Sequence, residues 1–172
     1  MIHCERNMGI EEIFLSQYGR IARVIQKVIG NSARAEELAV EVFLKLWRHP
    51  RAEGAPGEAW LYRTAVRMGL DEIRRQTRRA RYESLFALGR DRARQSPTPE
   101  QIHAAAEDNA RVRRVLAAMD RRQSELLILR SDGLSYEEVA SALGLNPASV
   151  GKLLSRAQQA FRKEYVKRYG EE

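Results

Sequence analysis

Four polar side chains near the carboxyl end of the chain recur at the spacing of one helical face. They are Ser149, Lys152, Ser155 and Arg156, and an apolar series occupies the opposite face of the same segment. Hydroxyl, ammonium and guanidinium groups in this arrangement can hydrogen-bond to base edges and phosphates in the major groove of DNA. Gly151 lies among them, although a glycine inside a helix costs about 1 kcal/mol relative to Ala. We expect it to allow close approach of the backbone to a DNA groove or to a neighbouring helix.

A helix-turn-helix is predicted to hold this polar face. Ser135 and Glu138 form a capping-box signature ahead of a short helix, which should end at Gly144. Asn146 can cap the next helix, with Pro147 at its first position, where a missing N–H costs nothing. Two helices joined by a tight turn also occur in purely structural bundles. The capped turn and the cationic outward face favour DNA binding over that alternative.

A second basic face is predicted on a helix over residues 58–83. This helix carries many arginines against only two acidic side chains in its middle, Asp71 and Glu72, and two aromatic residues lie near its start. Such a helix suits phosphate contact combined with stacking on exposed bases. The alternative is the solvated face of an ordinary helix, but the density of charge favours nucleic acid. The residues expected to contact nucleic acid here are Trp60, Tyr62, Arg63, Arg67, Arg74 and Arg75.

The helix predicted to begin after Asn31 or Ser32 is apolar on two sides. One apolar track should face the core, and it consists of Leu38, Val42 and Leu46. A second track consists of Val40, Phe43 and Trp47. A helix of this kind either lies between neighbours or offers one side to a partner. Burial of Phe43 and Trp47 in the core and exposure to a partner are equally open.

Composition narrows the class of protein. The chain of 172 residues carries a formal net charge of +7, which favours a polyanionic partner. Strand-like alternation is scarce, so an all-α fold is predicted. Cys4 is the single cysteine, which excludes an internal disulfide, and beside His3 it lacks the further ligands of a zinc site. No apolar run approaches the roughly 20 residues that span a bilayer, so we expect a cytoplasmic protein without membrane insertion.

Two small helical domains joined by a flexible linker are predicted. Residues 84–101 include Pro97 and Pro99 and have no sustained apolar stripe, which is typical of a linker. Residues 1–83 and 102–172 form helical blocks on either side. Each block has its own amphipathic helices, so we expect two separate cores. Within the first block the apolar pattern begins only at about residue 9, which makes Met8 an alternative start.

These motifs together resemble two domains of bacterial sigma factors. The runs AEELAVEVFLKLWRH and AWLYRTAVRMGLDEIRR resemble the second sigma domain, and the 116–161 block resembles the fourth. Only these two domains are present, as in the compact extracytoplasmic-function sigma factors. The resemblance implies a protein that gives core RNA polymerase its promoter selectivity, with no catalysis, cofactor or metal of its own.

The resemblance also implies the role of each helix. The 36–47 helix would dock on the clamp helices of the largest polymerase subunit. The 60–79 helix would bind the minus-10 promoter element, and the 146–163 helix would read the minus-35 element. The residues implied to contact polymerase are Glu36, Glu37, Val40, Glu41, Phe43, Leu46 and Trp47. Those implied to contact the minus-35 element are Asn146, Ser149, Lys152, Ser155, Arg156 and Arg130.

Within the last set, Lys152 and Arg156 are expected to read base edges, while Asn146 and Arg130 are expected to hold phosphates. The chain departs from the family at Arg67, where relatives commonly carry Asn. It departs again at 149–153, where Ser-Val-Gly-Lys-Leu replaces a run of the type Thr-Val-Lys-Ser-Arg. Its sequence preference is therefore not transferable from relatives. Promoter DNA and core polymerase are the expected partners, and an anti-sigma factor is a further candidate.

Two other classes of function remain open at this stage. A stand-alone helix-turn-helix regulator would bind duplex DNA without polymerase, and it predicts a dimer surface and a palindromic site. A helical interaction protein would use the arginine-rich helix for RNA. The first leaves the second apolar track without a role, and the second leaves the capped helix-turn-helix unexplained. Copurification with core RNA polymerase separates both from a sigma factor.

Overall fold

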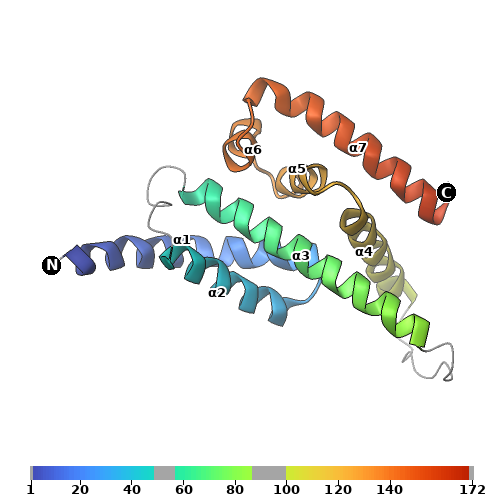
Figure 1. Ribbon diagram of the computed structural model, residues 1–172, viewed down its shortest axis with the longest axis horizontal. Coiled ribbons are helices and arrows are strands. Elements are labelled where there is room, and N and C mark those ends of the chain that lie inside the picture. Colours follow the sequence, from blue (N-terminus) through green and yellow to red (C-terminus); the bar gives the residue numbers. More distant parts are fainter. Residues whose placement is uncertain (1, 49–56, 87–99, 171–172) are drawn as a thin grey trace.

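The computed structural model describes residues 2–48, 57–86 and 100–170, with side chains described over 11–48, 57–83 and 106–170. Every regular element in these ranges is a helix, which confirms the all-α prediction (Figure 1). The helices are α1 (Ile2–Ile29), α2 (Ser32–Arg48), α3 (Gly57–Phe86), α4 (Glu100–Ala118), α5 (Arg121–Ser131), α6 (Tyr136–Leu143) and α7 (Pro147–Tyr169). We refer to α1–α3 as the first domain and to α4–α7 as the second domain.

The boundaries of three helices differ from those expected. Helix α1 extends back to Ile2, ahead of the point where its apolar pattern begins. Helix α3 continues to Phe86 and α4 begins at Glu100, so both ends of the predicted 84–101 linker are helical. The remaining linker residues, 87–99, lie outside the part of the chain that the structure describes.

The first domain is built around apolar stripes on three helices. Ile21, Val24 and Ile25 of α1 are completely buried, together with Val42 of α2. Helix α1 ends where Gly30 adopts a left-handed conformation with φ of +71°, a conformation that glycine accepts without penalty. The turn into α2 therefore forms at the position that the sequence indicated.

The second domain contains the predicted helix-turn-helix. Ser135 and Glu138 form both hydrogen bonds of the capping box at the start of α6. Gly144 ends α6 with a φ of +63°, and the Asn146 side chain caps α7 by accepting a hydrogen bond from the Ala148 N–H. All three local predictions are confirmed, because each depends only on neighbouring residues.

The two domains do not have separate cores, and that expectation is wrong. The buried apolar residues of both domains form one continuous cluster. Helix α3 packs against α1 and α2 on one side and against α4, α5 and α6 on the other (Figure 1). Periodicity in the sequence shows that a helix has an apolar face, but it does not show which helix of another domain will cover that face.

Candidate nucleic-acid interface

The polar face of α7 is exposed to solvent as predicted. Ser149, Lys152, Ser155 and Arg156 are all exposed. On the opposite side, the apolar residues of α7 are buried against the rest of the second domain, and they are Val150, Leu154 and Ala157. The buried stripe fixes the rotation of α7 about its axis, so the four polar side chains point away from the protein together.

Tyr136 is a residue of this surface that sequence reasoning missed. It is the first residue of α6 and is 47% exposed. The guanidinium of Arg130 lies 5.6 Å from the centre of its ring, and Arg130 Nη1 also donates a hydrogen bond of 2.9 Å to the Leu134 carbonyl. The Tyr136 ring lies against α7 at Gly151, where an added Cβ would be 3.4 Å from Tyr136 Cε2, an ordinary van der Waals distance. The ring contact therefore does not require a glycine at this position.

The predicted phosphate anchors have structural partners of their own. The Asn146 side-chain oxygen is occupied as the cap of α7. Arg130 is held between the Leu134 carbonyl and the Tyr136 ring. Both residues are nevertheless exposed, with Asn146 directly before α7 and Arg130 in the last turn of α5. They can therefore contact a phosphate with the atoms that these interactions leave unused.

On α3, the structure separates the predicted nucleic-acid contacts into three groups. Trp60 and Arg63 are half-buried, and Arg75 is exposed and bound to Glu72 at 2.9 Å. Arg67 and Arg74 both bind groups of the second domain. The basic face is therefore present as predicted, but part of it is covered.

Tyr62 is not a stacking platform in this structure, contrary to expectation. Its side chain is 5% exposed, because its position on α3 falls on the inner side with Leu61 and Val66. Burial raises the pKa of Tyr62, an effect that the nearby charge of Arg20 opposes. The Arg20 guanidinium lies 5.5 Å from the ring centre. The Tyr62 hydroxyl has no hydrogen-bond partner among the described residues.

A charged cluster ties α2 to α3 beneath this basic face. The Glu72 carboxylate is 7% exposed and accepts hydrogen bonds from Arg75 and Gln76, with Arg34 of α2 at 3.5 Å. Burial acts to raise the pKa of Glu72, but these hydrogen bonds and the charges of Arg75 and Arg34 lower it below its usual value. Glu72 is thus a buried carboxylate with partners on two helices.

Of the three residues in the predicted second apolar track of α2, Phe43 is not on the outward surface of the helix. That side chain is 4% exposed and makes an edge-to-face contact with Phe14 at 5.0 Å between ring centres. Trp47 and Val40 are exposed, at 59% and 42%, and Leu44 joins them at 39% although the sequence reasoning did not include it. Glu36, Glu37 and Glu41 are also exposed, whereas Leu46 is buried. Phe43 and Leu46 therefore belong to the core, and Trp47 with Val40 and Leu44 forms an exposed apolar surface with acidic side chains on the same helix.

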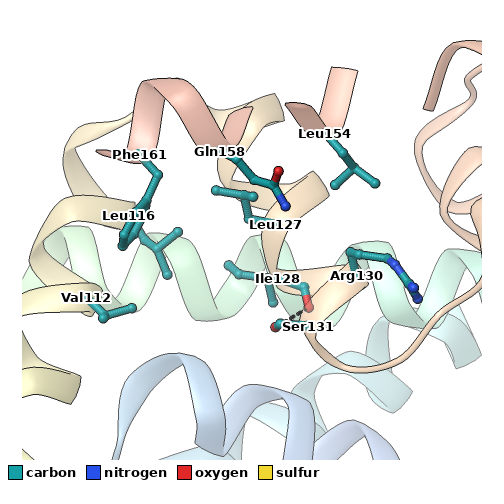
Figure 2. Close-up of a pocket in the computed structure, with 9 residues that line it drawn as sticks. All are labelled: Val112, Leu116, Leu127, Ile128, Arg130, Ser131, Leu154, Gln158 and Phe161. Atoms are coloured by element: carbon teal, nitrogen blue, oxygen red, sulfur yellow. Dashed lines mark hydrogen bonds between the residues drawn. The ribbon is translucent and has the colours of Figure 1, made fainter. Parts of the chain in front are cut away.

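An apolar pocket of about 390 Å³ opens between α4, α5 and α7, and no sequence motif indicated it (Figure 2). It is lined by Val112, Leu116, Leu127, Ile128, Arg130, Ser131, Leu154, Gln158 and Phe161. Phe161 is only partly buried and forms part of the wall. Apolar periodicity does not distinguish a filled core from a pocket lined by the same residues.

Within the described residues, no group of three or more His, Cys, Asp and Glu side chains is arranged to hold a metal ion. None of the described helices is long and apolar enough to cross a lipid bilayer.

Two protein families match the chain, in the order of its two domains. Sigma-70 region 2 matches residues 13–79. Sigma-70, region 4 matches residues 109–160. The first match covers most of the first domain, and the second covers the helix-turn-helix together with the end of α4 and all of α5.

Curated relatives align with most of this chain. The ECF RNA polymerase sigma factor SigE of Mycolicibacterium smegmatis is 29% identical over 168 residues, which is 94% of this chain and 63% of SigE. The ECF RNA polymerase sigma factor SigD of Mycobacterium tuberculosis is 30% identical over 158 residues, which is 86% of this chain and 68% of SigD. The chain thus spans about two thirds of the length of these relatives.

Solved structures share the fold at lower sequence identity. CnrH, in complex with the cytosolic domain of CnrY, aligns with a TM-score of 0.56 and 19% identity over 91% of this chain and 87% of CnrH. The sigma factor RpoE, in complex with the anti-sigma factor NepR from Bartonella quintana, aligns with a TM-score of 0.50 and 20% identity over 90% of this chain and 94% of RpoE.

Proposed function

Because the chain belongs to the ECF family of RNA polymerase sigma factors, we propose that it binds core RNA polymerase and directs promoter-specific initiation of transcription. The first domain corresponds to sigma domain 2 and the second to sigma domain 4. The observation that carries the proposal is the exposed polar face of α7 within a capped helix-turn-helix, in a chain that also carries the polymerase-binding domain of the family. The chemistry of RNA synthesis belongs to the polymerase, and sigma factors are not enzymes.

Recognition of the minus-35 element falls to α7. Lys152 and Arg156 are long enough to reach base edges, and Ser149 near the helix start is a shorter reader. Asn146 and Arg130 flank this face and would contact phosphates, which position the helix without reading sequence. Tyr136 supports Arg130 by the ring contact and would help to hold its guanidinium near the DNA backbone.

Polymerase docking falls to the exposed apolar surface of α2. Trp47 has the largest exposed apolar side chain there, and buried tryptophans dominate the energy of many protein interfaces. Val40 and Leu44 extend the apolar area, and the exposed carboxylates of Glu36, Glu37 and Glu41 supply a polar rim. The proposed partner is the clamp-helix coiled coil of the largest subunit. Phe43 would support this surface from within the core.

Recognition of the minus-10 element falls to α3. Its arginines would hold the DNA backbone, and Trp60 is the aromatic side chain available to stack on a base exposed by melting. A protein that acts with RNA polymerase on promoter DNA would be located in the cytoplasm. An anti-sigma factor is a further proposed partner.

Binding to core polymerase tests the proposal. The tagged full-length protein, incubated with bacterial core RNA polymerase, should elute with it as one complex in size-exclusion chromatography. A protein that binds duplex DNA, forms dimers and never coelutes with core polymerase would instead be a stand-alone helix-turn-helix regulator.

Substitutions on α7 distinguish base readers from other cations. Lys152→Ala and Arg156→Ala should each cost about 1–3 kcal/mol in promoter binding by the holoenzyme and relax preference at particular minus-35 base pairs. Lys167→Ala provides the control, because Lys167 is exposed in the last turn of the same helix, far from its amino end. Binding of each holoenzyme to a library of minus-35 variants measures both the loss of affinity and the change in base preference. An equal loss on every library member would show that the substituted residue contacts phosphate.

A further inference from the structure

Tyr136, the first residue of α6, lies beside a position of α7 that has no side chain. An added Cβ at Gly151 would lie 4.0 Å from the Tyr136 hydroxyl oxygen. Tyr136 is 47% exposed, and its hydroxyl makes no hydrogen bond within the part of the chain that the structure describes. At position 151, α7 itself presents only backbone, and the hydroxyl of Tyr136 occupies the space that a side chain there would enter.

Gly151 lies at one edge of the polar face of α7. At 3.6 residues per turn it is about 100° around the helix axis from Lys152, and Ser155 lies between the two. The major groove is about 12 Å wide, and an α-helix with its side chains is about 10–12 Å across. When the centre of the polar face lies over the bases, its edges therefore lie next to the phosphates that border the groove. The Tyr136 hydroxyl is at one of these edges.

A cation shares the ring of this tyrosine. The Arg130 guanidinium lies 5.6 Å from the ring centre. Its Nη1 donates a hydrogen bond of 2.9 Å to the Leu134 carbonyl, and the guanidinium has further N–H groups with which it can donate. A phosphate oxygen accepts hydrogen bonds from both hydroxyl and guanidinium groups. The Tyr136 ring thus brings a neutral donor and a charged donor to the same edge of the polar face.

The amino end of α6 is not itself a good site for an anion. Two carboxylates, Glu137 and Glu138, lie in its first turn. The Glu138 carboxylate is turned back and accepts a hydrogen bond of 2.7 Å from the Ser135 N–H, as part of the capping box. A phosphate contact in this region therefore depends on side-chain donors rather than on the helix terminus.

Building on the function proposed above, we propose that the Tyr136 hydroxyl donates a hydrogen bond to a DNA phosphate at the edge of the major groove, and that Arg130 binds the same phosphate. Tyr136 then supplies, from α6, a contact that Gly151 of α7 cannot make. Because a phosphate contact carries no sequence information, it strengthens binding to every duplex that α7 enters. It positions α7, while Lys152 and Arg156 read the bases.

Tyr136→Phe tests the hydroxyl alone, because it keeps the ring on which Arg130 lies. The full-length protein and labelled duplexes of several mixed sequences suffice, and fluorescence anisotropy at low salt gives the affinities. The affinity for each duplex should fall about three- to tenfold, the effect of one lost hydrogen bond. The dependence of affinity on salt concentration should not change, because a neutral hydroxyl releases no counterion from DNA.

Tyr169→Phe is the matched control. Tyr169 also carries a guanidinium over its ring, that of Arg111 at 5.4 Å. It lies 18 residues beyond Gly151 on the same helix, which is about 27 Å along the axis. The Tyr169→Phe variant should therefore bind every duplex with the affinity of the wild-type protein. Circular dichroism on each variant confirms that its helices are intact.

The shared phosphate is tested by combining two substitutions. Arg130→Gln alone should weaken binding and reduce the slope of log affinity against log salt by about 0.9, the value for one neutralised phosphate. The double variant with Tyr136→Phe should lose less affinity than the product of the two single losses, because the two groups act on one phosphate. A loss equal to that product would show two independent contacts and overturn the shared site.

Three further outcomes decide the proposal. Wild-type affinity of Tyr136→Phe for all duplexes would overturn the hydroxyl contact and leave the ring as a support for Arg130 only. A loss confined to particular duplex sequences would place the hydroxyl on a base edge and overturn the phosphate assignment. A protein whose variants behave as expected on duplex DNA but which never coelutes with core polymerase would keep the Tyr136 contact and refute the proposed sigma function instead.

Discussion

Replacing Phe43 with Ala is expected to lower the free energy of unfolding by about 3–5 kcal/mol. The side chain is 4% exposed and contacts Phe14 edge to face, with Tyr18 at 6.3 Å between ring centres. Removing the Phe43 ring leaves a cavity between α1 and α2, and the packed helices cannot move close enough to fill it completely. Urea unfolding followed by circular dichroism measures the change.

Leu44→Ala is the matched control for Phe43, because the neighbouring side chain on α2 is 39% exposed. Its effect on unfolding should stay below about 1 kcal/mol. If Phe43→Ala destabilises the protein no more than Leu44→Ala does, the aromatic cluster of Phe14, Tyr18 and Phe43 is not part of the stabilising core.

Replacing Trp47 with Ala is expected to weaken binding to core polymerase by about 2–4 kcal/mol, the range of a central tryptophan at a protein interface. The side chain is 59% exposed in the free protein, so its loss should change the free energy of unfolding by less than about 1 kcal/mol. Displacement of a fluorescent wild-type protein from core polymerase measures the first quantity, and urea unfolding measures the second.

Tyr82→Ala controls for the loss of any exposed aromatic residue. Tyr82 is 62% exposed near the end of α3, away from the proposed docking surface on α2. The Tyr82→Ala variant should bind core polymerase with the affinity of the wild-type protein. If the Trp47→Ala variant binds core polymerase with the same affinity as the wild-type protein, the docking surface does not lie at the end of α2.

Phe43 and Trp47 show where sequence reasoning reaches its limit. They are one helical turn apart, so both were placed on one apolar track, and periodicity treats them alike. The structure separates them because Phe14 and Tyr18 of α1 cover Phe43, whereas Trp47 lies in the last turn of α2 and remains exposed. Coverage by another helix is a property of the packed fold, and the pattern within α2 does not contain it.

Local features were predictable to the residue. Ser135, Gly144 and Asn146 act over two to four neighbouring positions, and their geometry follows from backbone chemistry alone. Asp120 belongs to the same class. It caps α5 by accepting from two backbone N–H groups, and its place directly before the helix was a signal that the sequence reasoning did not use.

Contacts between the domains were not predictable in this way. Arg67 and Glu125 are 58 positions apart, and the chain contains many other cations and carboxylates that could pair with either. Glu125 also precedes an apolar run, where a charge on a short helix would ordinarily face solvent. Its burial becomes intelligible only when α3 brings an arginine against α5.

Transcription reconstituted from purified parts tests the central claim most directly. Core RNA polymerase is mixed with the protein and a pool of genomic promoter fragments, and the 5′ ends of the transcripts are sequenced. A sigma factor predicts discrete start sites that core polymerase alone does not produce, and their loss when Lys152 and Arg156 are both replaced by Ala. Start sites identical to those of core polymerase alone, at protein concentrations that saturate its binding, would contradict the account.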